Sequence, residues 1–256
     1  MFLQYCSDLH LEFNQNSKFL KANPIVPKGD VLLLAGDICQ FDQIGKHRDF
    51  FDYISDHFSS CYWVPGNHEY YYSNIQHRSG KFAESIRSNV FLLNNSTVEL
   101  GETRLIFSTL WSKISQSKEK YIQRGMSDFH LINNDGHSFT PKMFNRLHQQ
   151  SVDFLTDAIK EDFQGNTVII SHHLPTFRRY PPQYRDSMIN EAFATHLDGL
   201  IETSGADYWI YGHHHQNVPD FRIGDTTLLT NQLGYVSHNE HYQFSTSECL
   251  KLEPVL

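Results

Sequence analysis

The chain has 256 residues, of which 39% are hydrophobic, and its net charge is -8 with the histidines neutral. This length excludes a mini-protein that depends on disulfides and fits one large α/β domain. The acidic balance argues against broad binding to a phosphate backbone, which requires a basic face. Four scattered cysteines without a CxxC pair argue against a zinc ribbon, and no apolar stretch is long enough to span a membrane.

The N-terminal part of the chain predicts a parallel sheet with crossover helices. Three short apolar runs, each closed by a turn, predict buried strands: "MFLQYC", "DVLLLAGD" and "CYWVPGNHE". Apolar residues recur at helical spacing within residues 41–60, between the second and third runs. A strand, helix and strand in this order are typical of parallel pairing. The first run lacks the basic start of a signal peptide, so we expect a cytoplasmic enzyme or binding protein.

The middle of the chain predicts helices around a group of short strands. A helix is expected at about residues 74–88, followed by strands in "VFLLNN", "TVEL" and "TRLIFSTLW" that hairpins connect. Residues 112–140 are polar, aromatic and weakly periodic, which predicts a long, partly helical excursion that forms a lid. The next apolar stripe predicts a helix over residues 144–163.

The last third continues the alternation of strands and helices. The apolar run "NTVIIS" leads into two histidines, and "ADYWIYG" leads into three. Between them a helix is expected at about residues 190–204, and a hairpin and a final strand near residues 248–252 close the chain. Neither an internal repeat nor a linker is visible, so we expect one domain over residues 1–256.

Five apolar runs end in acidic, amide or imidazole side chains: "DLH", "GD", "GNHE", "SHH" and "GHHH". Ligands of open α/β sheets bind outside the carboxyl ends of the strands, so we expect these five ends to converge. Taken one at a time, Asp8, Asp37 and Asn67 have ordinary roles in turns and helix caps. It is improbable that all five fall at strand ends for unrelated reasons.

The candidate ligands are two aspartates, one asparagine and four histidines. This set of oxygen and nitrogen donors without a thiolate suits divalent Mn, Fe, Co, Ni or Zn. It is too large for one tetrahedral zinc ion and predicts two ions that share a carboxylate. If the triplet is extended, His213 and His215 point the same way and His214 points away. The spacing alone does not choose between His172 and His173.

The ordered series D-x-H, G-D, G-N-H-E, a strand ending in H-H, and G-H-x-H resembles the calcineurin-like metallophosphoesterase superfamily. The resemblance runs from Ser7 to about Gln216 and implies an α/β fold, a four-layer αββα sandwich of two mixed β-sheets flanked by helices. Finer features, "TLWS", "SDFHLI" and "NQLGY", resemble an uncharacterised, mostly bacterial branch. Related sequences tend to have proline where this chain has Gln232.

The resemblance also assigns the metal ligands and chooses His172 over His173. The first ion would be held by Asp8, His10, Asp37 and His215. The second would be held by Asp37, Asn67, His172 and His213, with Asp37 bridging. His68 would contact the substrate and act as general acid, and Glu69 would support the site.

These residues predict a dinuclear metal phosphohydrolase that cleaves a phosphomonoester or phosphodiester through attack by a hydroxide that bridges two ions. The catalytic residues would be His68, Asp37 and Asn67. Candidate substrate contacts are Arg178, Arg179 and Trp111. We expect a small phosphorylated substrate, with neither nucleic acid nor a membrane as partner.

Three alternatives make different demands on the sequence. A nuclease with the same site would need a basic track beside it. A non-catalytic metal-binding module would be expected to lack some of the ligands, and all of them are present. An amidohydrolase barrel would need H-x-H on its first strand, where this chain has D-x-H.

Overall fold

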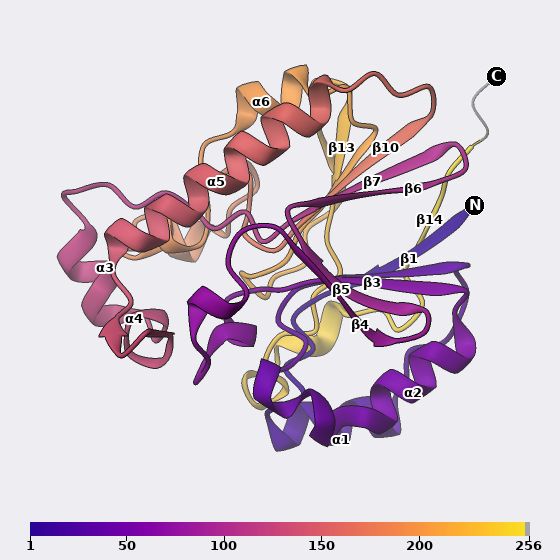
Figure 1. The fold of residues 1–256 in the computed structure, drawn as a ribbon, viewed down its shortest axis with the longest axis horizontal. Helices are drawn as coiled ribbons and strands as arrows, with labels where there is room; N and C mark the ends of the chain where they lie inside the picture. Colours follow the sequence, from indigo (N-terminus) through magenta and orange to yellow (C-terminus); the bar gives the residue numbers. More distant parts are fainter. Residues whose placement is uncertain (254–256) are drawn as a thin grey trace.

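The computed structural model describes residues 1–253 and contains two six-stranded mixed sheets that pack face to face (Figure 1). The first sheet has the order β14 (Cys249–Lys251), β1 (Phe2–Cys6), β2 (Val31–Ala35), β3 (Ser60–Val64), β5 (Val90–Asn94) and β4 (Phe82–Arg87). The second has the order β12 (Phe221–Ile223), β13 (Thr226–Leu229), β11 (Tyr208–Ile210), β10 (Asn166–Ser171), β7 (Thr103–Ser108) and β6 (Ser96–Leu100).

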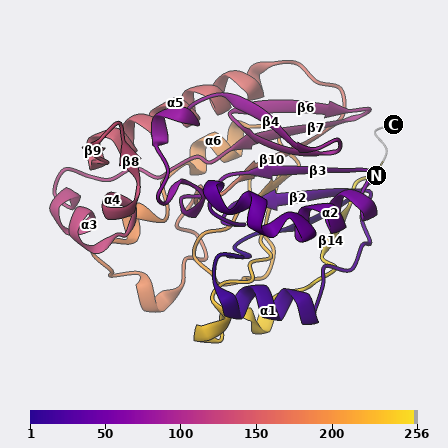
Figure 2. The ribbon, with the colours of Figure 1, turned by 60° about the horizontal axis from the view of Figure 1, so that its bottom comes forward.

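Helices cover the outer face of each sheet, so the predicted four-layer αββα sandwich is confirmed. Figure 1 shows α1 (Asn14–Ala22) and α2 (Arg48–His57) below the first sheet, and α5 (Pro141–Lys160) and α6 (Asp198–Thr203) above the second. At one end of the sandwich lie α3 (Glu119–Gly125), α4 (Asp128–Leu131) and the hairpin of β8 (Asn133–Asn134) and β9 (His137–Ser138) (Figure 2). Short 3₁₀ helices complete the chain: η1 (Phe41–His47), η2 (His68–Tyr70), η3 (Ile75–His77), η4 (Pro182–Tyr184), η5 (Asn190–Ala192), η6 (Val236–His238) and η7 (Glu240–Gln243).

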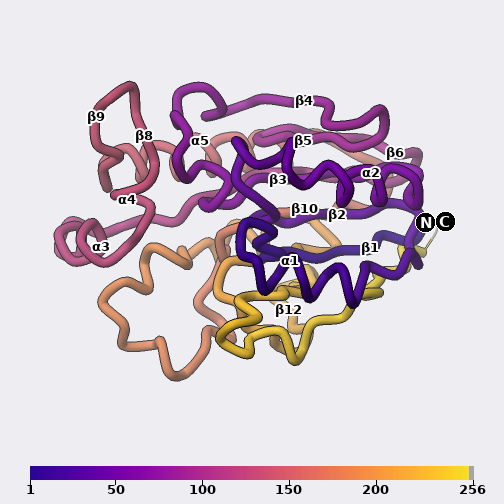
Figure 3. The backbone as a smooth tube through the Cα atoms, turned by 90° about the horizontal axis from the view of Figure 1, so that it is seen from below, coloured from indigo at the N-terminus to yellow at the C-terminus, as the bar shows by residue number. Residues whose placement is uncertain are grey.

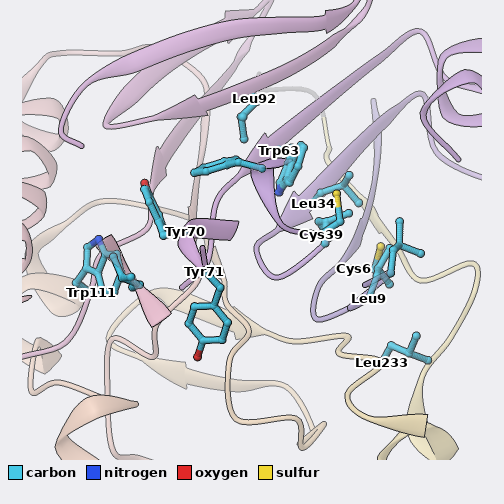
Figure 4. Close-up of a cluster of buried hydrophobic side chains, with 14 of the residues drawn as sticks. Cys6, Leu9, Leu34, Cys39, Trp63, Tyr70, Tyr71, Leu92, Trp111 and Leu233 are labelled. Carbon is cyan, nitrogen blue, oxygen red and sulfur yellow. The ribbon is translucent and has the colours of Figure 1, made fainter. Parts of the chain in front are cut away.

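Strand β2 is apolar throughout because both of its faces are buried. In β2, Val31 and Leu33 belong to the cluster between the two sheets, whereas Leu32 and Leu34 belong to the cluster under α1 and α2. This is the pattern of parallel strands with helices on the outside. Figure 4 shows how Leu34 and Trp63 lie together in the outer cluster.

Two predicted helices differ from the structure. The helix expected over residues 74–88 is wrong: this segment contains η3 and the edge strand β4, which pairs antiparallel with β5 from Phe82 and Asn94 onward. Pairing with a buried neighbour outweighs a weak helical period. The helix expected over residues 190–204 is divided into η5 and α6, and α1 was not predicted.

The topology brings the five predicted strand ends to one end of the molecule. β1, β2 and β3 are parallel neighbours in the first sheet, and β10 and β11 are parallel neighbours in the second. The five strand ends that carry the candidate ligands therefore come from both sheets, three from the first and two from the second. The first and last described residues lie at the other end of the molecule from these strand ends, as Figure 3 shows. Within residues 1–253, no helix is long and apolar enough to cross a bilayer.

Candidate metal centre

The backbone turns sharply after β1, β2 and β11, three of the five strands that reach this end. Five residues have left-handed φ angles, which side chains other than glycine rarely adopt: 55° at Asp8, 46° at His10, 56° at Asp37, 82° at His213 and 53° at His215. The D-x-H and H-H-H segments are therefore not extended. The alternation of side chains expected from an extended chain does not explain how these residues face one another.

The first cluster consists of Asp8, His10, Asp37 and His215, whose donor atoms all lie within 4.8 Å of one another. Nε2 of His10 and Nε2 of His215 are 3.0 Å apart. Nε2 of His215 lies 3.3 Å from Oδ1 of Asp8, and Nε2 of His10 lies 3.7 Å from Oδ2 of Asp37. Four buried or nearly buried donors from three strand ends thus point at one place.

The second cluster consists of Asp37, His172 and His213, with Asn67 beside them. Nε2 of His172 is 3.1 Å from Nδ1 of His213, 3.4 Å from Oδ2 of Asp37 and 3.2 Å from Oδ1 of Asn67. Asp37 therefore belongs to both clusters.

The two clusters have the donor spacing that a divalent ion requires. Bonds of about 2.1 Å at octahedral or tetrahedral angles separate neighbouring ligand atoms by about 3.0–3.4 Å. The closest donor pairs here lie 3.0–3.4 Å apart, and 3.7 Å separates His10 from Asp37. The residues present therefore fit a pair of ions.

Partners outside the clusters fix the orientation of three imidazoles. Nδ1 of His10 lies 3.0 Å from Oε1 of Glu12, Nδ1 of His215 lies 2.7 Å from Oε2 of Glu240, and Nδ1 of His172 lies 2.9 Å from the carbonyl oxygen of Ala35. A proton on Nδ1 leaves the Nε2 lone pair facing the cluster. Neither Glu12 nor Glu240 was predicted from the sequence to lie at the site. Glu12 was detectable as a carboxylate two residues after His10, whereas Glu240 belongs to no motif.

Asn67 is oriented by Asp128, a residue from the "SDFHLI" segment that the sequence analysis did not place at the site. Nδ2 of Asn67 donates to Oδ1 of Asp128 at 2.8 Å, and the Tyr71 hydroxyl donates to the same oxygen at 2.7 Å. Holding the amide nitrogen in this way turns Oδ1 of Asn67 toward His172.

Glu69 and His68 occupy different places around Asp37. The buried Glu69 carboxylate accepts backbone N–H bonds from Asp37, Ile38 and Gly66, so it holds the two loops together. The backbone N–H of His68 donates to Oδ1 of Asp37 at 2.9 Å. Its ring places Nδ1 3.0 Å from Oε1 of Glu12 and Nε2 3.3 Å from the Tyr235 hydroxyl.

A cavity of about 530 Å³ opens beside both clusters, and its floor includes the following residues: Asp37, Asn67, His68, His213 and His215. The three predicted substrate contacts lie elsewhere. Trp111 is only 2% exposed and packs with Tyr70 in the core (Figure 4). Arg178 faces Asp198 and Glu202, and neither Arg178 nor Arg179 lines the cavity.

Neither His173 nor His214 belongs to a cluster. Nδ1 of the buried His173 lies 3.2 Å from the carbonyl oxygen of Thr109. Nδ1 of His214 lies 2.9 Å from Nε2 of Gln232. The structure thus directs one histidine of each run to a different task from its neighbours.

Known proteins resemble this chain in sequence and in fold. The sequence model of the calcineurin-like phosphoesterase family matches residues 5–217. Uncharacterized protein L509 of Acanthamoeba polyphaga mimivirus is 34% identical over 269 residues, which cover 93% of this chain and 92% of that protein. The crystal structure of phosphopantetheinyl hydrolase (PptH) from Mycobacterium tuberculosis has a TM-score of 0.69 over 97% of this chain and 95% of its own, at 16% identity. The last similarity concerns the fold.

We expect Gly66→Ala to lower metal affinity by at least about tenfold, although Gly66 offers no ligand. A Cβ at this position would lie 2.2 Å from Oδ1 of Asp37 and 2.6 Å from Nε2 of His172, so both side chains would have to move. Metal content after dialysis, measured by mass spectrometry, tests this expectation. Gly45→Ala is the control, because nothing lies within 4 Å of its added Cβ. Equal metal content in the two variants would contradict the close packing described here.

We expect metal binding at pH 7 to release about one proton from each cluster. Burial lowers the pKa of His215, but its bonds to Asp8 and Glu240 raise it overall to about 10. Burial likewise lowers the pKa of His172, and the charge of Asp37 raises it overall to about 9. Metal-free protein therefore holds a proton on each ring, and affinity should increase as the pH rises from 7 toward these values.

Calorimetry in buffers of different ionisation enthalpy measures these protons. Glu240→Gln should reduce their number, because it removes a carboxylate that raises the pKa of His215. Metal binding without proton release at pH 7 would show that neither imidazole is protonated.

Proposed function

We propose a reaction for this chain on the premise that it belongs to the calcineurin-like phosphoesterase family and is a metal-dependent phosphoesterase. The reaction is hydrolysis of a phosphomonoester or phosphodiester with two divalent ions of Mn, Fe, Zn, Co or Ni. The observation that carries the proposal is the position of Asp37. Its Oδ2 lies 3.7 Å from Nε2 of His10 in one cluster and 3.4 Å from Nε2 of His172 in the other. A carboxylate shared in this way is suited to a pair of ions.

The proposed ligands follow the two clusters. Asp8, His10, Asp37 and His215 would hold one ion, and Asp37, Asn67, His172 and His213 would hold the other. When bound, such ions supply Lewis acidity toward the phosphoryl oxygens and lower the pKa of water to about 7, which provides a nucleophile at neutral pH.

His68 is proposed as the proton donor to the leaving oxygen. Burial lowers the pKa of its ring, but the charge of Asp37 and the bond to Glu12 raise it overall, which favours the protonated form that a proton donor requires. Glu12 accepts at Nδ1, so the proton to be transferred would be on Nε2, which lies 3.3 Å from the hydroxyl of Tyr235, another residue of the cavity. General acid catalysis of this kind contributes about 10²–10⁴-fold.

Three further proposals come from the sequence. They are a single domain over residues 1–256, a cytoplasmic location, and a lid formed by residues 112–140. The lid is supported by Met126 and Ser127, which line the cavity.

We expect Mn-loaded protein to release nitrophenol from p-nitrophenyl phosphate esters, and a chelator to abolish this activity. Asp37→Ala should lower kcat/KM by at least about 10²-fold because both ions lose a ligand, and His68→Ala should lower kcat by about 10²–10⁴-fold while metal content stays unchanged. Absorbance of nitrophenolate follows the reaction. Activity in Asp37→Ala equal to that of the unaltered protein would refute the proposal.

The histidine triplet offers a matched set of variants. His213→Ala and His215→Ala should each lose about one ion per chain, because they remove ligands of different ions. His214→Ala should retain both ions, since His214 faces Gln232 instead of a cluster. Metal analysis of the three purified variants decides, and equal losses in all three would contradict the assignment.

A further inference from the structure

The cavity beside the clusters has aromatic and apolar walls from segments far apart in the sequence. One wall comes from the region of α4 and another from the segment between β10 and α6, which lie side by side in Figure 3. Lys118 and Glu191 connect the two regions through an ion pair of 3.2 Å. The apolar wall residues are Met126, Leu131, Tyr180, Tyr184, Ile189 and Phe193.

Three aromatic residues that line the cavity are exposed to solvent. Phe13 is 43% exposed, Tyr72 is 65% exposed and Tyr184 is 48% exposed, and all three line the cavity. Exposed aromatic surface next to a few convergent polar groups is typical of a ligand site. A ring lying between these side chains would cover surface that is otherwise in contact with water.

The same cavity offers no side chain with a permanent positive charge. Within residues 1–253, neither lysine nor arginine lines it. Two divalent ions would carry four positive charges, and the carboxylates of Asp8, Asp37, Glu12 and Glu240 carry four negative charges. These carboxylates would therefore balance the charge of the ions, and among the described residues no lysine or arginine of the cavity remains for a second phosphate group.

We propose that the substrate is a phosphodiester with an uncharged aromatic substituent, a specificity that rests on the proposed function. A diester carries one negative charge, whereas a monoester carries about two at pH 7, so this balance of charge favours the diester. The phosphate group fills only a small part of a cavity of about 530 Å³. The substituent occupies the rest, with its ring against Tyr72 and Tyr184. Nucleoside triphosphates and nucleic acids are disfavoured because their additional phosphates meet no lysine or arginine in the cavity.

Two diesters with the same leaving group and the same charge isolate the ring. For Mn-loaded protein, p-nitrophenyl phenyl phosphate should show a kcat/KM about tenfold above that of p-nitrophenyl methyl phosphate, mainly through KM. p-Nitrophenyl phosphate and ATP should both be poorer substrates than the phenyl diester.

Variants of Tyr72 and Tyr184, which we call the rim of the cavity, test the contact between the substituent's ring and these tyrosines directly. Tyr72→Ala and Tyr184→Ala should each raise KM for the phenyl diester by about three- to tenfold, and should raise KM for the methyl diester less, because it has one aromatic ring fewer. Tyr121→Ala is the control, because Tyr121 is 60% exposed but lies outside the cavity. Ser187→Lys, which adds a cation to the wall, should lower KM for ATP.

The outcomes separate this inference from the proposed function. Equal kcat/KM for the two diesters, a preference for p-nitrophenyl phosphate or ATP, or rim variants that match Tyr121→Ala would each overturn the inference, while hydrolysis that depends on Asp37 would leave the function intact. Failure of metal-loaded protein to hydrolyse any of these esters would overturn both.

Discussion

The candidate centre depends on a backbone constraint: the chain must turn sharply in the segments that follow β1, β2 and β11. Left-handed φ angles at Asp8, His10, Asp37, His213 and His215 achieve this, at a cost of about 1–2 kcal/mol for each residue. Hydrogen bonds between the turns offset the cost. The N–H of Asp8 donates to the Gly36 carbonyl oxygen, that of His10 to the Asp37 carbonyl oxygen, and that of His213 to the Asp8 carboxylate. Each turn is therefore held by another, and the strands buried on both faces keep all of them in register.

Carboxylates just outside the clusters complete this support, and their environments differ. Burial raises the pKa of Glu69 well above its usual value, with the charge of Asp37 as a further cause, and its oxygens accept backbone N–H groups from both neighbouring loops. Burial also raises the pKa of Glu12, yet the charge of His10 and the bonds to His10 and His68 lower it overall to about 2. Glu69 thus fixes the backbone around Asp37, while Glu12 remains an anion and orients two imidazoles. A change of backbone angle in either loop would move donor atoms away from the separations of 3.0–3.7 Å found in the first cluster.

Much of the fold could be predicted from the sequence because strands buried on both faces appear as apolar runs. The five groups of candidate ligands were also recognisable, because each follows such a run. The family resemblance, which rests on the order and spacing of the five motifs, led to the two mixed sheets and to the choice of His172 rather than His173; spacing alone did not. Edge strand β4 escaped prediction because its half-exposed residues carry a weak pattern that pairing with β5 overrides. Asp128 and Glu240 were missed for another reason. Each contacts the site through tertiary structure, 61 residues from Asn67 and 25 residues from His215, so no local pattern marks it.

Gln232, at the position where the family resemblance leads us to expect proline, gives the members of the histidine triplet different partners. Its backbone N–H donates to Oδ1 of Asn217 at 2.7 Å, a bond that proline could not make. Its side-chain Oε1 accepts the backbone N–H of His215 at 2.8 Å, and its Nε2 faces Nδ1 of His214. Burial lowers the pKa of His214 to about 4, so this ring is neutral and accepts that bond. The middle histidine is thereby tied to the loop that shapes the triplet, and the left-handed backbone on either side of it turns His213 and His215 toward the two clusters.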